Sequence, residues 1–168
     1  MKSSRRKLAA AAAGVTIAPL VTVALPAASA YAHGYVSSPA SRQAQCAQRI
    51  VQCGQIQWEP QSVEGPKGLQ SCSGGNVRFS DLDDDSKPWR AASVGNSVTF
   101  NWTFTARHAT RDYEYFLNGR SLGKFSAQSS SHTVNLGGVS GRQKVLAVWN
   151  IADTANAFYA CVDLQVGR

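Results

Sequence analysis

The stretch from residue 97 to residue 105 restricts the possible folds of this chain most, because apolar and polar residues alternate in it without a break. The apolar positions are Val98, Phe100, Trp102 and Phe104. A period of two places successive side chains on opposite faces of a β-strand, so these four residues should face a core. The stretch predicts a long strand with one buried and one solvated face.

Further strands are predicted toward the C-terminus. Residues 112–117 and 120–125 flank the tight-turn pair Asn118-Gly119, which predicts a hairpin. Strands are also expected at 132–136, at 143–151, which is apolar on both faces, and at 158–166, where the even positions form one apolar face. Short strands with turn signals, and a short helix expected only around 41–51, predict an all-β sandwich of immunoglobulin or fibronectin type III kind.

Residues 34–90 show little regular periodicity, because prolines and glycines interrupt them. We therefore expect a long loop region between the first strand and the main sheets, and loops of this length commonly carry function. The acidic run 81–85 lacks the glycine and distal Glu of an EF-hand, which predicts a solvated turn.

Residues 1–32 have the three parts of a secretory signal: a basic start, an apolar middle and the small-residue end Ala30-x-Ala32. Pro19 and Pro26 argue against a membrane anchor. We expect a secreted, extracellular protein whose signal is removed, and both the general and the twin-arginine export routes remain open. The remaining residues 33–168 have the size of a single domain.

The charge of the chain changes with that removal. Residues 1–32 contain four of the 17 Lys and Arg residues, so residues 33–168 carry 13 basic against 10 acidic residues, a net charge of +3. This value does not favour a nucleic-acid partner. We expect no nucleic-acid partner, no membrane association of the processed chain, and a monomer.

All four cysteines lie in the exported part of the chain. An even number of cysteines in an oxidising compartment predicts two disulfides, for which three pairings are open. Cys46–Cys53 is the local choice, and Cys72–Cys161 would then tie a long loop to the last strand. A zinc site is disfavoured because the chain has no Cys-x-x-Cys pair.

The three histidines are His33, His108 and His132. A cut after Ala32 would give His33 a free α-amine, with a pKa of about 8, beside its imidazole. His108 follows the end of the alternating strand, whereas His132 lies in a serine-rich strand start and is predicted to be a surface residue. Two imidazoles and one amine form the nitrogen environment that Cu(II) prefers.

Four blocks of this chain, in order, resemble the bacterial chitin-binding proteins now classed as lytic polysaccharide monooxygenases of auxiliary activity family ten. The blocks are 33–42, 57–65, 105–108 and 145–159. The resemblance implies an immunoglobulin-like sandwich, one copper ion in a "histidine brace", and oxidative cleavage of crystalline polysaccharide.

The resemblance also implies roles for single residues. His33 and His108 match the copper ligands. Phe158 matches the apolar residue in an axial direction beside the copper, and Ala106 matches the small residue over the other axial approach. Glu64 matches a carboxylate near the copper that could hydrogen-bond a bound oxygen species.

The resemblance implies roles for further residues. Asp153 and Asn156 align with a polar rim near the metal. Trp58 matches an exposed aromatic residue on the flat substrate face, where a ring can stack on a sugar. Trp102 and Trp149 lie in apolar strand patterns and are predicted to be core residues.

These features predict a copper enzyme that uses oxygen or hydrogen peroxide and an external electron donor. The alternatives are a chitin-binding module without chemistry and a copper carrier; a paired-carboxylate hydrolase is disfavoured. Residues 59–65 resemble the chitin-active branch, which favours crystalline chitin over cellulose and attack at the anomeric carbon.

Overall fold

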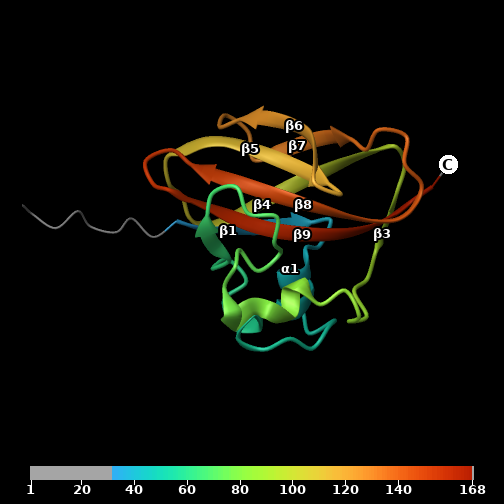
Figure 1. Cartoon of the computed structure of the whole chain (residues 1–168), viewed down its shortest axis with the longest axis horizontal. Helices are drawn as coiled ribbons and strands as arrows, with labels where there is room; N and C mark the ends of the chain where they lie inside the picture. Colours follow the sequence, from blue (N-terminus) through green and yellow to red (C-terminus); the bar gives the residue numbers. More distant parts are fainter. Residues whose placement is uncertain (1–31, 168) are drawn as a thin grey trace, which may run out of the picture.

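The computed structural model describes residues 32–167, so the predicted secretory signal lies almost wholly outside the described residues. Two β-sheets dominate the fold (Figure 1). The smaller sheet has the order β1 (His33–Ser38), β4 (Ser97–Ala106) and β7 (Ser131–Asn135). The larger sheet has the order β2 (Glu64–Pro66), β9 (Asn156–Val166), β8 (Gly141–Ile151), β5 (Thr110–Leu117) and β6 (Arg120–Ser126). A short strand, β3 (Ala92–Val94), pairs with β9 in parallel.

The alternating stretch forms β4, as predicted, and packs one face into the core between the sheets. Val98, Phe100 and Trp102 are buried there, and Phe104 is half-buried at the end of the strand. The predicted hairpin is also present, since β5 and β6 pair on either side of Asn118-Gly119. The chain therefore folds into the predicted β-sandwich.

Strands β8 and β9 are buried on both faces because a second core covers the larger sheet from outside. The even residues of β9, from Phe158 to Val166, belong to the core between the sheets. Tyr159 and Cys161, at odd positions, belong to the second core, together with Leu146 and Val148 of β8. This arrangement explains why β8 has an uninterrupted apolar run from Val145 to Trp149.

The loop region supplies the other side of that second core. It contains α1 (Arg42–Ala47), η1 (Gln55–Trp58) and η2 (Val77–Asp83), which lie below the sandwich in Figure 1. The Ser41 hydroxyl caps α1 by accepting a hydrogen bond from the amide of Ala44. No helix within residues 32–167 is long and apolar enough to span a membrane.

Two disulfides hold the loop region, with the pairing that the sequence analysis described. Cys46–Cys53 closes the segment after α1, and Cys72–Cys161 joins the loop region to β9. The second bond spans 89 positions of the chain, so it restricts the unfolded chain strongly.

A buried ion pair also joins α1 to β9. Arg42 is only 1% exposed, and its Nε donates to Asp163 Oδ2 at 2.8 Å. Its guanidinium also donates to the Leu82 carbonyl at 2.8 Å and to Asp85 at 2.7 Å. Burial lowers the pKa of Arg42, but the hydrogen bonds and charges of Asp163 and Asp85 outweigh it, so the net pKa is raised.

The prediction that His132 is a surface residue is wrong. His132 is 4% exposed, and its Nδ1 lies 2.7 Å from the hydroxyl of Tyr115. Trp102 Nε1 donates to the same hydroxyl at 3.1 Å, so the Tyr115 hydroxyl is free to donate to His132. The serines around His132 suggested a solvated segment, but the period of β7 directs His132 and Val134 inward.

The acidic run 81–85 is largely exposed, as expected, yet it is more structured than a solvated turn. Asp81 accepts a hydrogen bond from the amide of Gly54 at 2.8 Å. Asp83 accepts from the amide of Cys72 at 2.7 Å, and Asp85 accepts from Lys144 at 2.7 Å. The run therefore connects the loop segments to one another and to β8.

Candidate metal site

The β1–β4 ladder brings the first residue of β1 to the end of β4. His33 pairs with Ala106, the last residue of β4, and His108 follows two residues later in the chain. The two histidines predicted as ligands therefore lie at the same end of the sandwich. Ala106, with only a methyl side chain, stands directly opposite His33.

His108 is held against the turn between β8 and β9. Its Nε2 lies 2.6 Å from Asp153 Oδ1, and its side chain is only 9% exposed. The backbone fixes the same junction, because the amide of Ala152 donates to the Ala109 carbonyl at 2.7 Å. Asp153, predicted as a rim residue, thus orients the imidazole of His108.

Phe158 lies between this site and the core. It is fully buried, pairs with Glu64 in the β2–β9 ladder, and its ring lies tilted against that of Trp149, with the ring centroids 5.0 Å apart. Its ring centroid is 6.4 Å from that of His33. Phe158 is therefore both a core residue and a neighbour of the predicted ligand.

Glu64 lies on the short strand β2 at the same end of the sandwich. Its Oε1 accepts a hydrogen bond from Asn156 Nδ2 at 2.8 Å, and the Glu64 side chain is exposed. Lys67 Nζ donates to the Thr154 carbonyl at 2.5 Å and so ties β2 to the turn that carries Asp153. The structure thus links Glu64 to Asn156 and places both beside the turn that holds His108.

Trp58 ends η1 and is 67% exposed, whereas Trp102 and Trp149 are buried core residues as predicted. The guanidinium of Arg49 lies 5.9 Å from the centre of the Trp58 ring. The neighbouring Glu59 forms an ion pair with Arg78. The sequence analysis did not identify Arg49 or Arg78, because neither residue belongs to a motif.

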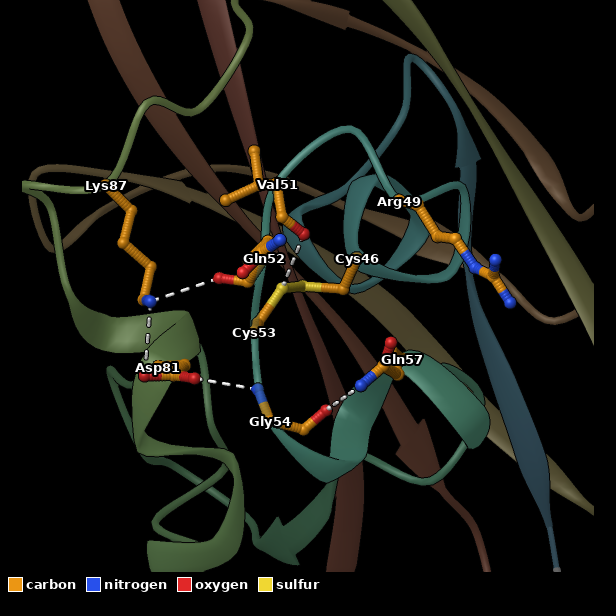
Figure 2. A pocket seen from close by; sticks show the side chains of 9 residues that line it. All are labelled: Cys46, Arg49, Val51, Gln52, Cys53, Gly54, Gln57, Asp81 and Lys87. Carbon is orange, nitrogen blue, oxygen red and sulfur yellow. Dashed lines mark hydrogen bonds and ion pairs between the residues drawn. A yellow bond between two sulfur atoms is a disulfide. The ribbon is translucent and has the colours of Figure 1, made fainter.

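A hollow of about 580 Å³ lies between the loop after α1 and η2, and its lining includes Gln57, the residue before Trp58 (Figure 2). Its polar groups mostly bond one another. Lys87 donates to the Gln52 carbonyl at 3.1 Å and lies 3.4 Å from Asp81, while Arg49 points away from them. These bonds stiffen the loop that carries Trp58.

The donor set fits copper if the α-amine of His33 takes part. Within residues 32–167 no group of three or more His, Cys, Asp or Glu side chains is arranged to hold a metal. Two imidazoles therefore need a further donor, and a chain that begins at His33 would supply its amine. Imidazole and amine nitrogens suit copper among the common metals.

The fold and the two histidines at one end of it define a class: immunoglobulin-like sandwiches in which a histidine at the start of β1 lies opposite the end of β4, close to a second histidine. The family model for "lytic polysaccharide mono-oxygenase, cellulose-degrading" matches residues 33–122 and 118–164. The chain belongs to this family of monooxygenases.

Relatives agree with the assignment. The lytic chitin monooxygenase of Streptomyces ambofaciens is 57% identical over 160 residues, which cover 92% of this chain and 93% of that protein. A lytic polysaccharide monooxygenase of Jonesia denitrificans superposes with a TM-score of 0.75 at 44% identity, covering 80% of this chain and all of that chain. A Bacillus amyloliquefaciens protein in complex with Cu(I) superposes at 0.68 with 25% identity, covering 80% of this chain and all of that one.

Proposed function

We propose that this protein is a secreted, copper-dependent monooxygenase that cleaves crystalline chitin by oxidation at the anomeric carbon. The observation that carries the proposal is the pairing of His33 with Ala106, which brings His33 to the strand end that precedes His108. The chitin substrate is supported by the 57% identical relative named for chitin. Removal of residues 1–32 would create the required amine.

His33 and His108 would hold one copper ion through their imidazoles, with the His33 amine as third donor. Bound copper supplies one-electron chemistry with oxygen or peroxide. The reaction inserts one oxygen atom into a C–H bond beside the glycosidic linkage, and the hydroxylated product then loses that linkage. With oxygen as co-substrate, two electrons and two protons are also needed, and an external donor provides the electrons.

The residues around the histidines have distinct tasks. Asp153 fixes the orientation of the His108 ring. Buried Phe158 keeps water from the core side of the site, and Ala106 leaves room opposite His33. The Glu64 carboxylate, oriented by Asn156, can accept a hydrogen bond or hold a proton close to the reacting atoms.

The substrate would lie across the surface of the loop region that carries Trp58. Trp58 offers a large exposed ring to the apolar face of a sugar. The hydrogen bonds around the neighbouring hollow reduce the entropy lost when that loop meets a flat surface. We expect a monomer, because a flat solid substrate requires one free face.

The test uses a chain that begins at His33 and is loaded with one equivalent of copper. Ascorbate serves as the reductant. β-Chitin and microcrystalline cellulose are incubated separately, and soluble products are analysed by mass spectrometry. We expect oxidised chitin oligosaccharides from the native protein and none from His108→Ala. Binding of β-chitin without oxidised products would instead favour a non-catalytic module, and copper binding without either would favour a carrier.

A further inference from the structure

We propose that Val77 and Arg78, at the start of η2, form a second contact with crystalline chitin, separate from the Trp58 contact. The inference rests on the proposed function, because it takes chitin as the substrate. It adds a substrate-contacting segment that lies 13 or more positions after Glu64 and outside the four blocks that resemble the family.

The first observation is the exposure of two hydrophobic side chains. Within residues 32–167, Trp58 at 67% and Val77 at 86% are the large hydrophobic residues left exposed. The remaining large apolar side chains are covered at least in part. Exposed apolar groups that lie close together mark contact surfaces rather than random variation.

The second observation is that an ion pair joins the two segments that carry these side chains. Glu59, which follows Trp58, pairs with Arg78, which follows Val77. Consecutive Cα atoms are only about 3.8 Å apart, so both exposed side chains stand one residue from the same ion pair. The segments that carry Trp58 and Val77 are therefore held together by one ion pair.

The segment that carries Val77 is fixed in place. The Asn76 side chain accepts a hydrogen bond from the amide of Arg78 at 3.0 Å, and the Arg78 guanidinium lies 5.2 Å from the Phe79 ring centre. On the other side, Glu59 is held in a turn because its carbonyl accepts from Ser62 at 2.9 Å. Little conformational entropy remains to be lost on binding.

This fixed segment also adjoins the strand that carries Glu64. A Cβ on Gly65 would lie 1.9 Å from the carbonyl oxygen of Gly74, so the backbones of the two segments touch. Glu64 precedes Gly65, and Val77 follows Gly74 by three residues, so the two side chains lie on segments whose backbones are in direct contact. The segment that carries Val77 is thereby anchored to the strand that carries Glu64.

The chemistry of the strip fits a neutral polysaccharide. Sugar rings present apolar C–H faces and hydroxyl edges, which match two apolar side chains and a charge-balanced pair. The Arg78 side chain is 60% exposed and the Glu59 side chain 31%, so both retain free hydrogen-bonding capacity at the surface. The pair carries no net charge, which disfavours a strongly acidic or basic partner.

The test measures binding isotherms of metal-free protein on β-chitin and on microcrystalline cellulose, so that the readout does not depend on the loaded enzyme. Val77→Ser removes the apolar contact, Val77→Leu keeps it, and Gln165→Ala changes an exposed residue on β9. We expect Val77→Ser to weaken binding to β-chitin about 3- to 10-fold, as for a partly buried aliphatic group. Val77→Leu and Gln165→Ala should bind like the native protein, and thermal unfolding should show all variants folded.

Native affinity in Val77→Ser would overturn the inference and leave the proposed function intact. If Val77→Ser binds β-chitin more weakly while the native, copper-loaded protein yields no oxidised products, the contact is supported and the enzymatic proposal is overturned. A native protein that binds cellulose but not β-chitin would overturn the inference together with the proposed substrate.

Discussion

His33 stands opposite Ala106 in the β1–β4 ladder, so a one-residue change at the start of β1 acts directly on the proposed metal site. We predict that a chain beginning at Ala32 folds like one beginning at His33 but binds copper at least 10-fold more weakly, because its histidine nitrogen is a peptide nitrogen. Isothermal titration with Cu(II) measures the affinity, and oxidised product yield should fall in parallel. One alanine added after Arg168 is the control; equal copper affinity in all three chains would refute the amine as a ligand.

Gly65 allows β2 to lie against the loop at Gly74, and β2 carries Glu64. Gly65→Ala would push its Cβ to within 1.9 Å of the Gly74 carbonyl oxygen, so the backbones must separate. We expect a loss of about 1–3 kcal/mol in unfolding free energy, as in other overpacked sites. Gly95→Ala, where no atom lies within 4 Å of the new Cβ, is the control and should unfold at the native temperature. Matching thermal transitions in the two variants would contradict the close contact.

Glu64 accepts its hydrogen bond from Asn156 through one carboxylate oxygen. A substitution can therefore keep this hydrogen bond while it removes the negative charge. In Glu64→Gln the amide oxygen can accept the same bond, so the fold and copper affinity should be unchanged while oxidised products fall at least 10-fold. Glu114→Gln, a change to a carboxylate that bonds Ser121 on the β5–β6 hairpin, is the matched control. Native turnover in Glu64→Gln would remove the carboxylate from the mechanism.

The sandwich could be predicted from the sequence because each of its strands has a strong local signature. The alternation in β4 and the Asn118-Gly119 turn depend on neighbours within a few residues, and the structure confirms both. The loop region has no such period, and the partners of Arg42 lie 40 to 121 positions away. No local pattern shows such a pair.

The candidate site could be proposed from the sequence for a different reason. Its residues lie in blocks that resemble a family, whereas the geometry depends on the register between β1 and β4. His132 shows the limit of local composition: its serine neighbours suggested exposure, yet the strand period buries it among Tyr113, Tyr115 and Phe125. Arg78 was missed because its ion pair with Glu59 exists only in the folded loops.

Burial lowers the pKa of His132 below the ordinary value of about 6.5, because the charged ring is poorly solvated there. Between the folded and the ordinary pKa, the unfolded chain binds a proton that the folded chain does not. Folding stability contributed by His132 is therefore complete above about pH 6.5 and is lost as the pH falls toward the folded pKa. We expect urea midpoints to fall from pH 7.5 to pH 5.

The control for this pH dependence is His132→Asn, whose side-chain oxygen can accept from Tyr115 but does not titrate. This variant should be less stable at pH 7.5, because the smaller side chain leaves a cavity, yet its midpoints should depend less on pH. A pH dependence as steep as that of the native protein would show that His132 is not its source.

The Arg42–Asp163 pair stabilises the junction of α1 and β9 only while both partners are present. Asp163 is 3% exposed, so Arg42→Met leaves a buried carboxylate with only the more distant Arg142 at 3.3 Å. We expect a loss of about 3–5 kcal/mol in unfolding free energy, the usual cost of a buried charge without its partner.

The double variant measures the interaction energy of Arg42 and Asp163 separately from the cost of burying the two charges. Arg42→Met with Asp163→Leu removes both buried charges, so it should lose less stability than the sum of the two single variants, with a coupling of about 1–3 kcal/mol. Guanidinium denaturation of the four proteins in one buffer gives this coupling directly. Strict additivity would mean that Asp85 and Arg142 compensate for each lost partner, because both already contact the pair.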